Sequence, residues 1–438
     1  MLRRFAMLLF LVGLLLAAAA CAPSAAPTPT PTKAAPAVAP TAAPKVEATK
    51  PAEKPAATPT AAPSKPTGAP IKLGFVTPLS GPMTSLGVLQ RIAGKLAEED
   101  VNATGGINGA PLQLVIEDSP FDPKQAVTVL RKLAEQDRVF AVVGPFSSAE
   151  FDSAAPLSND LKLAVVTGSG MKVGVAASNR PYSFMVSHRG DITFGPAIDV
   201  FKRTFPNVKR VVLTGDTKEA VTEYMVRNRL PTILKEKGLE IIDTVALETR
   251  MTDFSAVVTK IKELNPEGVV LSALQPEAIN FAKEYQRQGM KAPVVTSVHV
   301  MGGSLAELAG DSIEGWIIPG FMDYENTDPA VQNFTARFFK AAEADQAVRP
   351  KPSIIVTEGV YYDTVMALAE IMRKAGVKAD MPLQQARDAI RDGLQNLRGY
   401  KGVNGTITMP ASGELEREPQ TVVTAEKGKW KNLWKGIR

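Results

Sequence analysis

Two adjacent hydroxyl groups, on Ser147 and Ser148, are the side chains in this sequence best placed to bind a small ligand. They follow an apolar run at 140–143, which predicts a short buried strand, and a break at Gly144-Pro145. An apolar-periodic segment begins directly behind them and predicts a helix that starts at the two serines. At such a turn in an open α/β sheet, unpaired amides and the helix dipole favour anions, so paired hydroxyls there can hold a carboxylate.

Ser147 also has a purely structural interpretation. Ser147-x-x-Glu150 has the spacing of a capping box, in which each side chain accepts a hydrogen bond from the other residue's amide. We therefore favour a capping role for Ser147 and keep ligand contact as its alternative. Ser148 has no comparable duty in the sequence pattern, which makes it the better ligand candidate. The neighbouring Phe146 belongs to the same group of candidates.

Other residues capable of chemistry do not form a recognisable catalytic or cofactor site. The turn Gly168-Ser169-Gly170 has neither the G-x-G-x-x-G spacing of a dinucleotide site nor the G-x-S-x-G of a hydrolase. His188 and His299 are the only histidines, and no cysteine stands beside them to support a zinc site. We therefore expect no cofactor, no metal and no enzyme activity. His299 follows a predicted strand and is kept as a candidate ligand contact, although a lone histidine is more often structural.

The first 21 residues have the layout of an export signal. Arg3 and Arg4 precede an apolar run at 5–20 that is shorter than the ~20 residues of a membrane-spanning helix. Cys21, the only cysteine, follows immediately and resembles the lipidated residue of a bacterial lipobox, although Ala18 stands where leucine is usual. We expect a signal peptide at 1–20 and a lipid anchor on Cys21 at the periplasmic or extracellular face of the membrane. Plain secretion is the alternative.

Residues 21–70 predict an extended tether. Of the 34 prolines, 13 lie in 22–70, which is rich in alanine and threonine, has no aromatic residue and cannot bury a core. A proline-rich recognition segment is the alternative, but aromatic and arginine flanks are missing. The first 70 residues carry the whole formal charge of +5, so residues 71–438 are neutral. Binding to nucleic acid therefore lacks electrostatic support and is not expected.

Strand and helix signals alternate along residues 71–320, which predicts parallel sheets built from right-handed crossovers. The pattern begins again near 187–191, so we expect two similar lobes. Strands are expected at 71–77, 111–118, 140–143, 163–167, 208–213, 239–247, 268–271 and 293–296. Further helices are expected at 86–101, 123–137, 192–205, 218–237, 254–264 and 276–288. The last part predicts helices around 329–344, 353–375 and 382–396, then short strands at 405–409 and 421–424.

Several stretches, taken together, resemble one known family. They are Thr77-Pro-Leu-Ser-Gly-Pro82, Asp122-Pro-Lys-Gln-Ala-Val127, Val143-Gly-Pro-Phe-Ser-Ser148, Asp253-Phe-Ser-Ala256 and Gly310-Asp-Ser-Ile-Glu-Gly315. Over residues 71 to about 433, the chain is similar to the solute-binding proteins of ABC importers with the type I periplasmic-binding fold. The resemblance is to their branched-chain amino-acid-binding (leucine/isoleucine/valine-binding-like) branch.

This resemblance implies an α/β fold of two Rossmann-like lobes with parallel sheets, joined by three crossovers, which close like a clamshell on a ligand. Lobe 1 is expected to comprise 71–188 and 320–395, and lobe 2 to comprise 189–319 and 396–438. The resemblance also implies a monomer that delivers a small-molecule ligand to an ABC permease and its ATPase complex. A sensory module that reports to a signalling protein is the alternative hypothesis, and an oxidoreductase with bound nicotinamide is a third.

In lobe 1 the resemblance places the ligand carboxylate on Ser148. The turn Ser169-Gly170-Met171 is expected to supply a backbone carbonyl and a hydroxyl, with Met171 standing where the hydroxyl residue is expected. Ser85, which follows the first strand, is a further candidate contact.

In lobe 2 the family uses aromatic residues and an acid that pairs with the ligand ammonium. The corresponding positions here are Ala220, Leu274 and Val298, while Asp216 falls four residues before the expected aromatic. Because a desolvated ammonium without a carboxylate partner is costly, these departures favour a ligand that has no ammonium group. We therefore expect an apolar carboxylate or amide, with an amino acid as the alternative.

Overall fold

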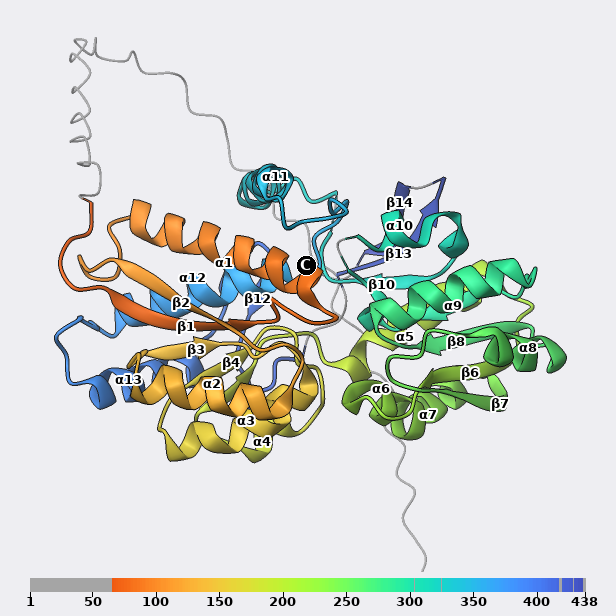
Figure 1. The fold of residues 1–438 in the computed structure, drawn as a ribbon, viewed down its shortest axis with the longest axis horizontal. Coiled ribbons are helices and arrows are strands. Elements are labelled where there is room, and N and C mark those ends of the chain that lie inside the picture. Colours follow the sequence, from red (N-terminus) through yellow and green to blue (C-terminus); the bar gives the residue numbers. More distant parts are fainter. Residues whose placement is uncertain (1–64, 303, 324, 417–419, 428, 436–438) are drawn as a thin grey trace, which may run out of the picture. The chain divides into compact units, whose positions relative to one another are not determined.

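The computed structural model describes residues 65–302, 304–323, 325–416, 420–427 and 429–435. The expected signal peptide, Cys21 and nearly all of the expected tether lie outside these residues. Within the described ranges, no helix combines the length and the apolar character needed to cross a membrane. These residues form two α/β lobes, each built around its own parallel sheet (Figure 1).

The first lobe is organised around a five-stranded parallel sheet of order β2-β1-β3-β4-β5. Its strands are β1 (Ile71–Thr77), β2 (Leu112–Asp118), β3 (Ala141–Val143), β4 (Val165–Thr167) and β5 (Ser183–Met185). The intervening helices are α1 (Thr84–Ala103), α2 (Pro123–Glu135), α3 (Ser148–Asp160) and α4 (Val175–Ser178). The four strands predicted for this part of the chain are confirmed.

The second lobe repeats this plan with a four-stranded parallel sheet of order β7-β6-β8-β9. Its strands are β6 (Arg210–Asp216), β7 (Glu240–Leu247), β8 (Gly268–Ser272) and β9 (Val294–Thr296). Its helices are α5 (Gly190–Thr204), α6 (Ala220–Tyr224), α7 (Leu230–Glu236), α8 (Ser255–Glu263), α9 (Gln275–Arg287) and α10 (Leu305–Ala309). The predicted α/β fold of two similar lobes is thereby confirmed.

The single helix predicted at 218–237 is wrong in one respect. A π-helical turn, Met225–Arg229, separates α6 from α7. Pro231 lies at the start of α7, lacks an amide hydrogen and crowds the carbonyl four residues before it. A wider π turn at this point accommodates the crowding.

The C-terminal part of the chain serves both lobes. In the second lobe, β10 (Ile318–Gly320) pairs antiparallel with β13 (Thr421–Glu426), which pairs in turn with β14 (Lys429–Lys435). The other elements are α11 (Pro329–Ala344), α12 (Glu358–Lys374), α13 (Leu383–Gln395), β11 (Tyr400–Gly402) and β12 (Gly405–Ile407). These five elements lie with the first lobe, and α11 runs above α1 in Figure 1.

The last passage between the lobes differs from the expected division at residue 396. Leu397, Ile407 and Leu415 are buried in the core of the first lobe together with α12 and α13, whereas Val423 is buried in the second. The described residues from Leu397 to Leu415 therefore pack with the first lobe, and β13 packs with the second. The reason is that the apolar side chains around the β11–β12 hairpin still face the first core.

Both sheets are buried on two faces, which explains their nearly continuous apolar strands. In β1, Ile71, Leu73 and Phe75 face a core that contains α1 and α12, and Val76 faces the opposite core, formed with α2 and α3. The second sheet alternates in the same way between α8 and α9 on one face and α5 and α7 on the other. Polar side chains are therefore concentrated where the strands end.

Gly144 ends β3 under a tight steric constraint. Its φ of +110° lies in the left-handed region, and a Cβ atom there would stand 2.3 Å from the carbonyl oxygen of Val76. Only glycine allows this turn to pass so close to β1 and to aim the following serines at the end of the sheet.

We predict that Gly144→Ala destabilises the protein more than a left-handed backbone alone would. Gly109 is the matched control, because its φ is +91° but no atom lies within 4 Å of a Cβ built there. Gly109→Ala should lower the free energy of unfolding by about 1–2 kcal/mol, and Gly144→Ala by clearly more. Urea unfolding of the two variants measures this difference, and equal losses would contradict the steric explanation.

Candidate functional site

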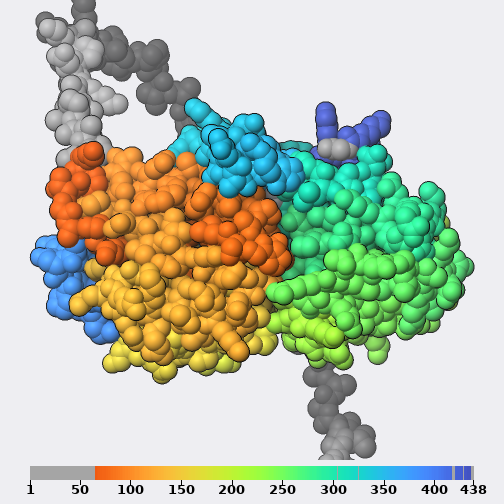
Figure 2. Space-filling view, viewed as in Figure 1, coloured from red at the N-terminus to blue at the C-terminus, as the bar shows by residue number. Residues whose placement is uncertain are grey.

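A cavity lies between the two lobes, at the carboxyl ends of their parallel strands. On the face shown in Figure 2, the orange surface of the first lobe abuts the green surface of the second. The cavity has a volume of about 60 Å³, which suits a compact ligand. Its walls are formed by Met83, Leu86, Phe121, Phe146, Ser147, Ser148, Ser169, Met171, Glu219, Val221, Leu274, Gln275, Val298, His299, Met301, Phe321, Val356 and Thr357.

The cavity brings together most of the residues that the sequence indicated. The candidates that line it are Phe146, Ser147, Ser148, Ser169, Met171, Leu274, Val298 and His299. Ser85, Gly170 and Ala220 are not among its lining residues. Lobe 1 supplies the first five lining candidates and lobe 2 the other three, so the two sets lie on opposite walls.

Ser147 forms the capping box that its spacing predicts. Its Oγ accepts a hydrogen bond from the Glu150 amide at 3.1 Å, and the Glu150 carboxylate accepts one from the Ser147 amide at 2.9 Å. Burial raises the pKa of Glu150, and further hydrogen bonds from Ser119 and the Asp122 amide oppose that rise. The cap fixes where α3 begins, and with it the position of both serines.

Ser148 has a structural duty that the sequence pattern did not indicate. Its buried Oγ accepts hydrogen bonds from the amides of Met171 at 3.0 Å and Lys172 at 3.2 Å. These bonds tie the start of α3 to the turn after β4 and use both lone pairs of the hydroxyl. Toward a ligand, Ser148 can therefore act only as a donor.

The turn after β4 is held by hydroxyl groups on both sides. Ser169 Oγ donates to the Phe146 carbonyl at 2.8 Å and lies 2.8 Å from the buried Tyr361 hydroxyl. Gly170 turns away from the cavity because its amide donates to Thr167 Oγ1 at 2.8 Å. Ser169 thus reaches the cavity as part of a network that is already paired within the lobe.

Phe121 was not a candidate, yet it lines the cavity from a strained backbone. Its φ is +61°, which is rare for a bulky side chain and costs about 1–2 kcal/mol. Its ring lies 6.2 Å from the ring of Phe146, centroid to centroid. Such strain persists only where surrounding structure enforces it, and it clusters at ligand sites. The two rings form an aromatic wall on the first lobe.

On the second lobe, the expected contact at Ala220 is replaced by its neighbours. Glu219 and Val221 line the cavity, because Glu219 folds back to cap α6. Glu219 Oε2 accepts bonds from the amides of Val221 at 3.0 Å and Thr222 at 2.9 Å and from the Thr222 hydroxyl at 3.0 Å. Burial raises the pKa of Glu219, and these bonds oppose the rise. The wall is thus less uniformly apolar than the sequence suggested.

The helix predicted at 353–375 begins only at residue 358, and two residues of the irregular segment before it become part of the cavity wall. Val356 and Thr357 lie in the irregular segment before α12 and line the cavity. Pro350 and Pro352 disfavour helix only in the residues before them, so they do not mark this boundary. No sequence signal marks Met83 or Leu86 either, which lie at the start of α1.

His299 and Gln275 bring unpaired polar atoms to the second wall. Both ring nitrogens of His299 and the Nε2 of Gln275 are buried without a hydrogen-bond partner among the described residues. His299 is partly exposed as a residue, but its ring nitrogens are not. Burial lowers the pKa of His299 to about 4, so the imidazole is neutral at pH 7.

Two carboxylates near the ends of the second sheet each have one unpaired oxygen. Asp216 Oδ2 and Glu277 Oε2 are buried without a partner in the described part of the chain, and neither residue lines the cavity. Burial raises the pKa of Glu277. No group of three or more histidine, cysteine, aspartate or glutamate side chains among the described residues is arranged to hold a metal ion.

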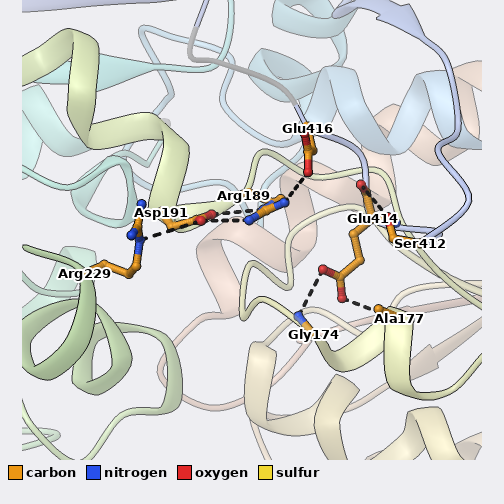
Figure 3. A network of polar contacts seen from close by, with 8 residues as sticks. All are labelled: Gly174, Ala177, Arg189, Asp191, Arg229, Ser412, Glu414 and Glu416. Atoms are coloured by element: carbon orange, nitrogen blue, oxygen red, sulfur yellow. Dashed lines mark hydrogen bonds and ion pairs between the residues drawn. The ribbon is translucent and has the colours of Figure 1, made fainter. Parts of the chain in front are cut away.

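A charged network connects two of the crossovers between the lobes (Figure 3). The first crossover follows β5 and contains Arg189, and the third contains Glu414 and Glu416. Arg189, which follows β5, donates two hydrogen bonds to Asp191 at the start of α5, at 3.0 and 2.8 Å. It donates a third to Glu416 at 2.6 Å. Hydrogen bonding to Asp191 raises the pKa of Arg189. Because Glu416 is exposed, the paired bonds to Asp191 fix the crossover more firmly than the bond to Glu416.

Glu414 attaches the third crossover to the first lobe. Its carboxylate accepts bonds from the amides of Gly174 at 3.0 Å, Ala176 at 2.9 Å and Ala177 at 3.2 Å, and so caps α4. The backbone beside it bonds to Met185 of β5. The two crossovers therefore run side by side.

Glu358 is a fully buried carboxyl group next to the cavity. Its Oε2 accepts a hydrogen bond from the Val356 amide, and its Oε1 has no partner among the described residues. Burial raises its pKa to about 7. The native protein therefore holds this proton at a pH where an ordinary glutamate has lost it.

A family model of periplasmic binding proteins matches residues 70–429. The chain is 26% identical over 355 residues to the leucine-, isoleucine-, valine-, threonine-, and alanine-binding protein of Pseudomonas aeruginosa, covering 80% of this chain and 89% of that protein. It is 27% identical over 347 residues to the Leu/Ile/Val-binding protein of Escherichia coli, covering 79% and 88%.

Solved structures share the fold. A branched-chain amino acid transporter substrate binding protein from Streptococcus pneumoniae, in complex with isoleucine, superposes with a TM-score of 0.70 at 20% identity and covers 83% of this chain and 98% of that chain. An ABC transporter solute binding protein from R. palustris, in complex with 4-hydroxybenzoate, superposes with a TM-score of 0.70 at 17% identity, covering 83% and 95%. At these identities, the likeness concerns the fold alone.

We predict that Glu358→Gln stabilises the protein at high pH. A folded-state pKa of about 7 exceeds the ordinary value, so stability from the protonated carboxyl is lost as pH rises from about 4.5 through 7. Glutamine keeps an acceptor for the Val356 amide and cannot ionise. The free energy of unfolding should therefore rise by up to about 3 kcal/mol at pH 8 and change much less at pH 5.

Urea unfolding at the two pH values measures this effect. The exposed Glu343→Gln variant is the control and should show no such difference between pH 5 and pH 8. A gain of equal size at both values would contradict a buried proton on Glu358.

Proposed function

Because the chain belongs to the periplasmic binding protein family, we propose that it binds a compact, largely apolar carboxylate in the cavity between its lobes. The family consists of solute-binding proteins that act outside the cytoplasm, deliver small molecules to an ABC permease and are not enzymes. The chain is accordingly an exported solute-binding protein of an ABC importer. A role as a sensory module has no support from these relatives.

The observation that carries the proposed ligand class is the hydrogen bonding of Ser148. Both lone pairs of its hydroxyl accept backbone amides, so its hydrogen is available for an acceptor on the ligand. Ser147 adds a second hydroxyl, which also accepts an amide and can donate to the ligand. Two donors at the start of α3 favour a carboxylate, since charge-assisted bonds are the stronger ones and the helix dipole adds to them.

The remaining walls suit an apolar body. Phe121 and Phe146 line one side, and Leu274 and Val298 line the other. A site with a few directed polar groups in a mainly apolar cavity is typical for small organic ligands. Solved structures of this fold hold both isoleucine and 4-hydroxybenzoate, so the architecture is compatible with either class of ligand.

An amino acid is the second candidate ligand. The named relatives bind leucine, isoleucine and valine, and the unpaired oxygens of Asp216 and Glu277 could accept an ammonium if they turned toward the cavity. We favour a ligand without an ammonium group, because neither carboxylate lines the cavity. Glu219 does line it, but its Oε2 already accepts three hydrogen bonds from the start of α6, so only its Oε1 is left to accept an ammonium.

Capture of the ligand is proposed to involve closure of the lobes about their crossovers. The first and third crossovers, joined through Arg189 and Glu416, would bend together. On the packing of the two cores, lobe 1 would comprise 71–188 and 325–416, and lobe 2 would comprise 189–320 and 420–435. We propose that the protein acts as a monomer, since each chain contains both walls of its own cavity.

We further propose that the mature protein is anchored to the membrane through Cys21. The supporting observations are the apolar run that ends at this residue, its position as the only cysteine and the proline-rich tether behind it. A diacylglyceryl group together with an N-acyl chain is sufficient for stable anchoring.

The anchor predicts a change in location for Cys21→Ser. Expressed in a bacterial host, the wild-type protein should sediment with membranes, and the variant should be found in the soluble or secreted fraction. Ser24→Ala, three residues away, is the control and should remain with the membranes. Continued membrane attachment of Cys21→Ser would exclude lipidation at this residue.

The ligand class predicts the outcome of a thermal-shift and calorimetric screen. Compact apolar carboxylates should raise the melting temperature, whereas leucine and the corresponding uncharged esters should not. Ser148→Ala should weaken carboxylate binding about 10- to 150-fold, the value of one hydrogen bond to a charged group. Ser147→Ala should also weaken carboxylate binding, because it removes the second donor, and it should lower the free energy of unfolding by about 1 kcal/mol through the lost cap.

Tight binding of leucine without binding of apolar carboxylates would overturn the proposal in favour of an amino acid. Unchanged affinity in Ser148→Ala would place the carboxylate elsewhere in the cavity.

A further inference from the structure

Two polar side chains that line the second wall of the cavity have buried atoms without a hydrogen-bond partner in the described part of the chain. Gln275, the first residue of α9, is 95% buried, and its Nε2 has no hydrogen-bond partner among the described residues. His299 lies in the 3₁₀ turn Val298–Val300 after β9, and both of its ring nitrogens are likewise buried and unpaired in the described structure. Both residues line the cavity that Ser148 faces from the first lobe.

A glycine lies against each of these two side chains, more closely against Gln275 than against His299. A Cβ atom at Gly302 would lie 2.4 Å from three atoms of the Gln275 amide group, so the amide packs flat against the glycine backbone. A Cβ atom at Gly190 would lie 3.4 Å from Cε1 and 3.6 Å from Nε2 of the His299 ring. The Gln275 amide therefore needs the glycine at position 302, whereas His299 only makes ordinary van der Waals contact beside Gly190.

Buried polar atoms without partners are rare in native proteins and call for an explanation, because the chain has lost their bonds to water. Elsewhere in the cavity, polar side chains are paired within the chain: Ser147 and Glu219 cap helices, and Ser169 bonds to Phe146 and Tyr361. Gln275 and His299 differ from these residues. Their unpaired atoms are explained if the ligand supplies the partners.

We infer that Gln275 and His299 form a second polar subsite, which selects carboxylates that carry a neutral hydroxyl group at the end remote from the carboxylate. This inference rests on the proposed function, because it takes the carboxylate to be held by the serines of the first lobe. A hydroxyl oxygen can accept from the Gln275 Nε2 hydrogen while its own hydrogen is donated to the unprotonated nitrogen of the imidazole.

Other end groups match the two side chains less well. A carbonyl oxygen could accept from Gln275 but would leave the acceptor nitrogen of His299 unpaired. A methyl group would leave both residues unpaired, and a second carboxylate would be buried without a cation, since neither lysine nor arginine lines the cavity. Because the imidazole is neutral at pH 7, it offers one donor and one acceptor and no charge.

The test measures the binding of matched acids with and without the hydroxyl group by calorimetry on the full chain. The pairs are benzoate with 4-hydroxybenzoate and hexanoate with 6-hydroxyhexanoate. The wild-type protein should bind at least one hydroxylated acid about 10-fold or more tightly than its partner, the effect expected when buried polar groups would otherwise stay unpaired.

Two variants each remove one of the two side chains that form the subsite. Gln275→Met and His299→Leu should each reduce the ratio of affinities within the preferred pair to about 3-fold or less, by weakening the hydroxylated acid and not the other. Leu274→Ala is the matched control on the same wall and should weaken both acids of a pair by the same factor, leaving the ratio unchanged.

The outcomes separate this inference from the proposed function. Equal binding of both acids in each pair to the wild-type protein, or an unchanged ratio in both variants, would overturn the inference and leave the proposed carboxylate site standing. If none of the four acids binds, the proposed ligand class fails and the inference fails with it.

Discussion

Burial of both faces of each sheet is the constraint on which the site depends. Residues of β1, β3, β6 and β8 meet packed helices whichever way they point, so these strands are almost wholly apolar. Polar groups and unpaired amides can then gather only where the parallel strands end and the helices begin. When the carboxyl ends of the strands in two such sheets lie on either side of a cavity, the cavity has apolar walls and a few directed polar groups. The architecture thus determines where a ligand can bind before any particular side chain does.

The polar side chains of the cavity fall into three kinds, and the differences between them indicate what the ligand must provide. Glu219 and Ser147 each cap a helix and so hold the walls in place, while Ser147 keeps its hydroxyl hydrogen to donate and Glu219 keeps its Oε1 to accept. Ser148 is half satisfied, because it accepts two amides and keeps one hydrogen to donate. Gln275 and His299 are unsatisfied. Partner atoms are therefore lacking at opposite walls, which is the arrangement expected for a short ligand with a polar group at each end.

The sequence was most informative where the structure depends on interactions between residues that are close along the chain. Apolar periodicity located the strands, and the capping box located the start of α3, because both signals depend on neighbouring residues. It was less informative where distant segments meet. The acceptor role of Ser148 depends on the turn at Met171, 23 residues away, and the packing of the residues after 396 on the first core depends on their contact with α12. Glu219 and Val221 line the cavity in place of Ala220 because Glu219 caps α6, an arrangement that the sequence pattern did not indicate.

Met171 links the proposed carboxylate subsite on the first lobe to the packing between the two lobes. Its amide is held by Ser148, its carbonyl accepts a bond from the Gly190 amide at 3.4 Å, and its side chain is buried among Val221 and Val298 of the second lobe. One residue therefore contacts the proposed carboxylate subsite, the first crossover and the opposite wall. The methionine that stands in place of a hydroxyl residue removes a polar ligand contact but adds apolar packing between the lobes. Because a carboxylate on Ser148 would share that hydroxyl with the Met171 amide, ligand binding and the packing of the closed lobes cannot be independent of each other.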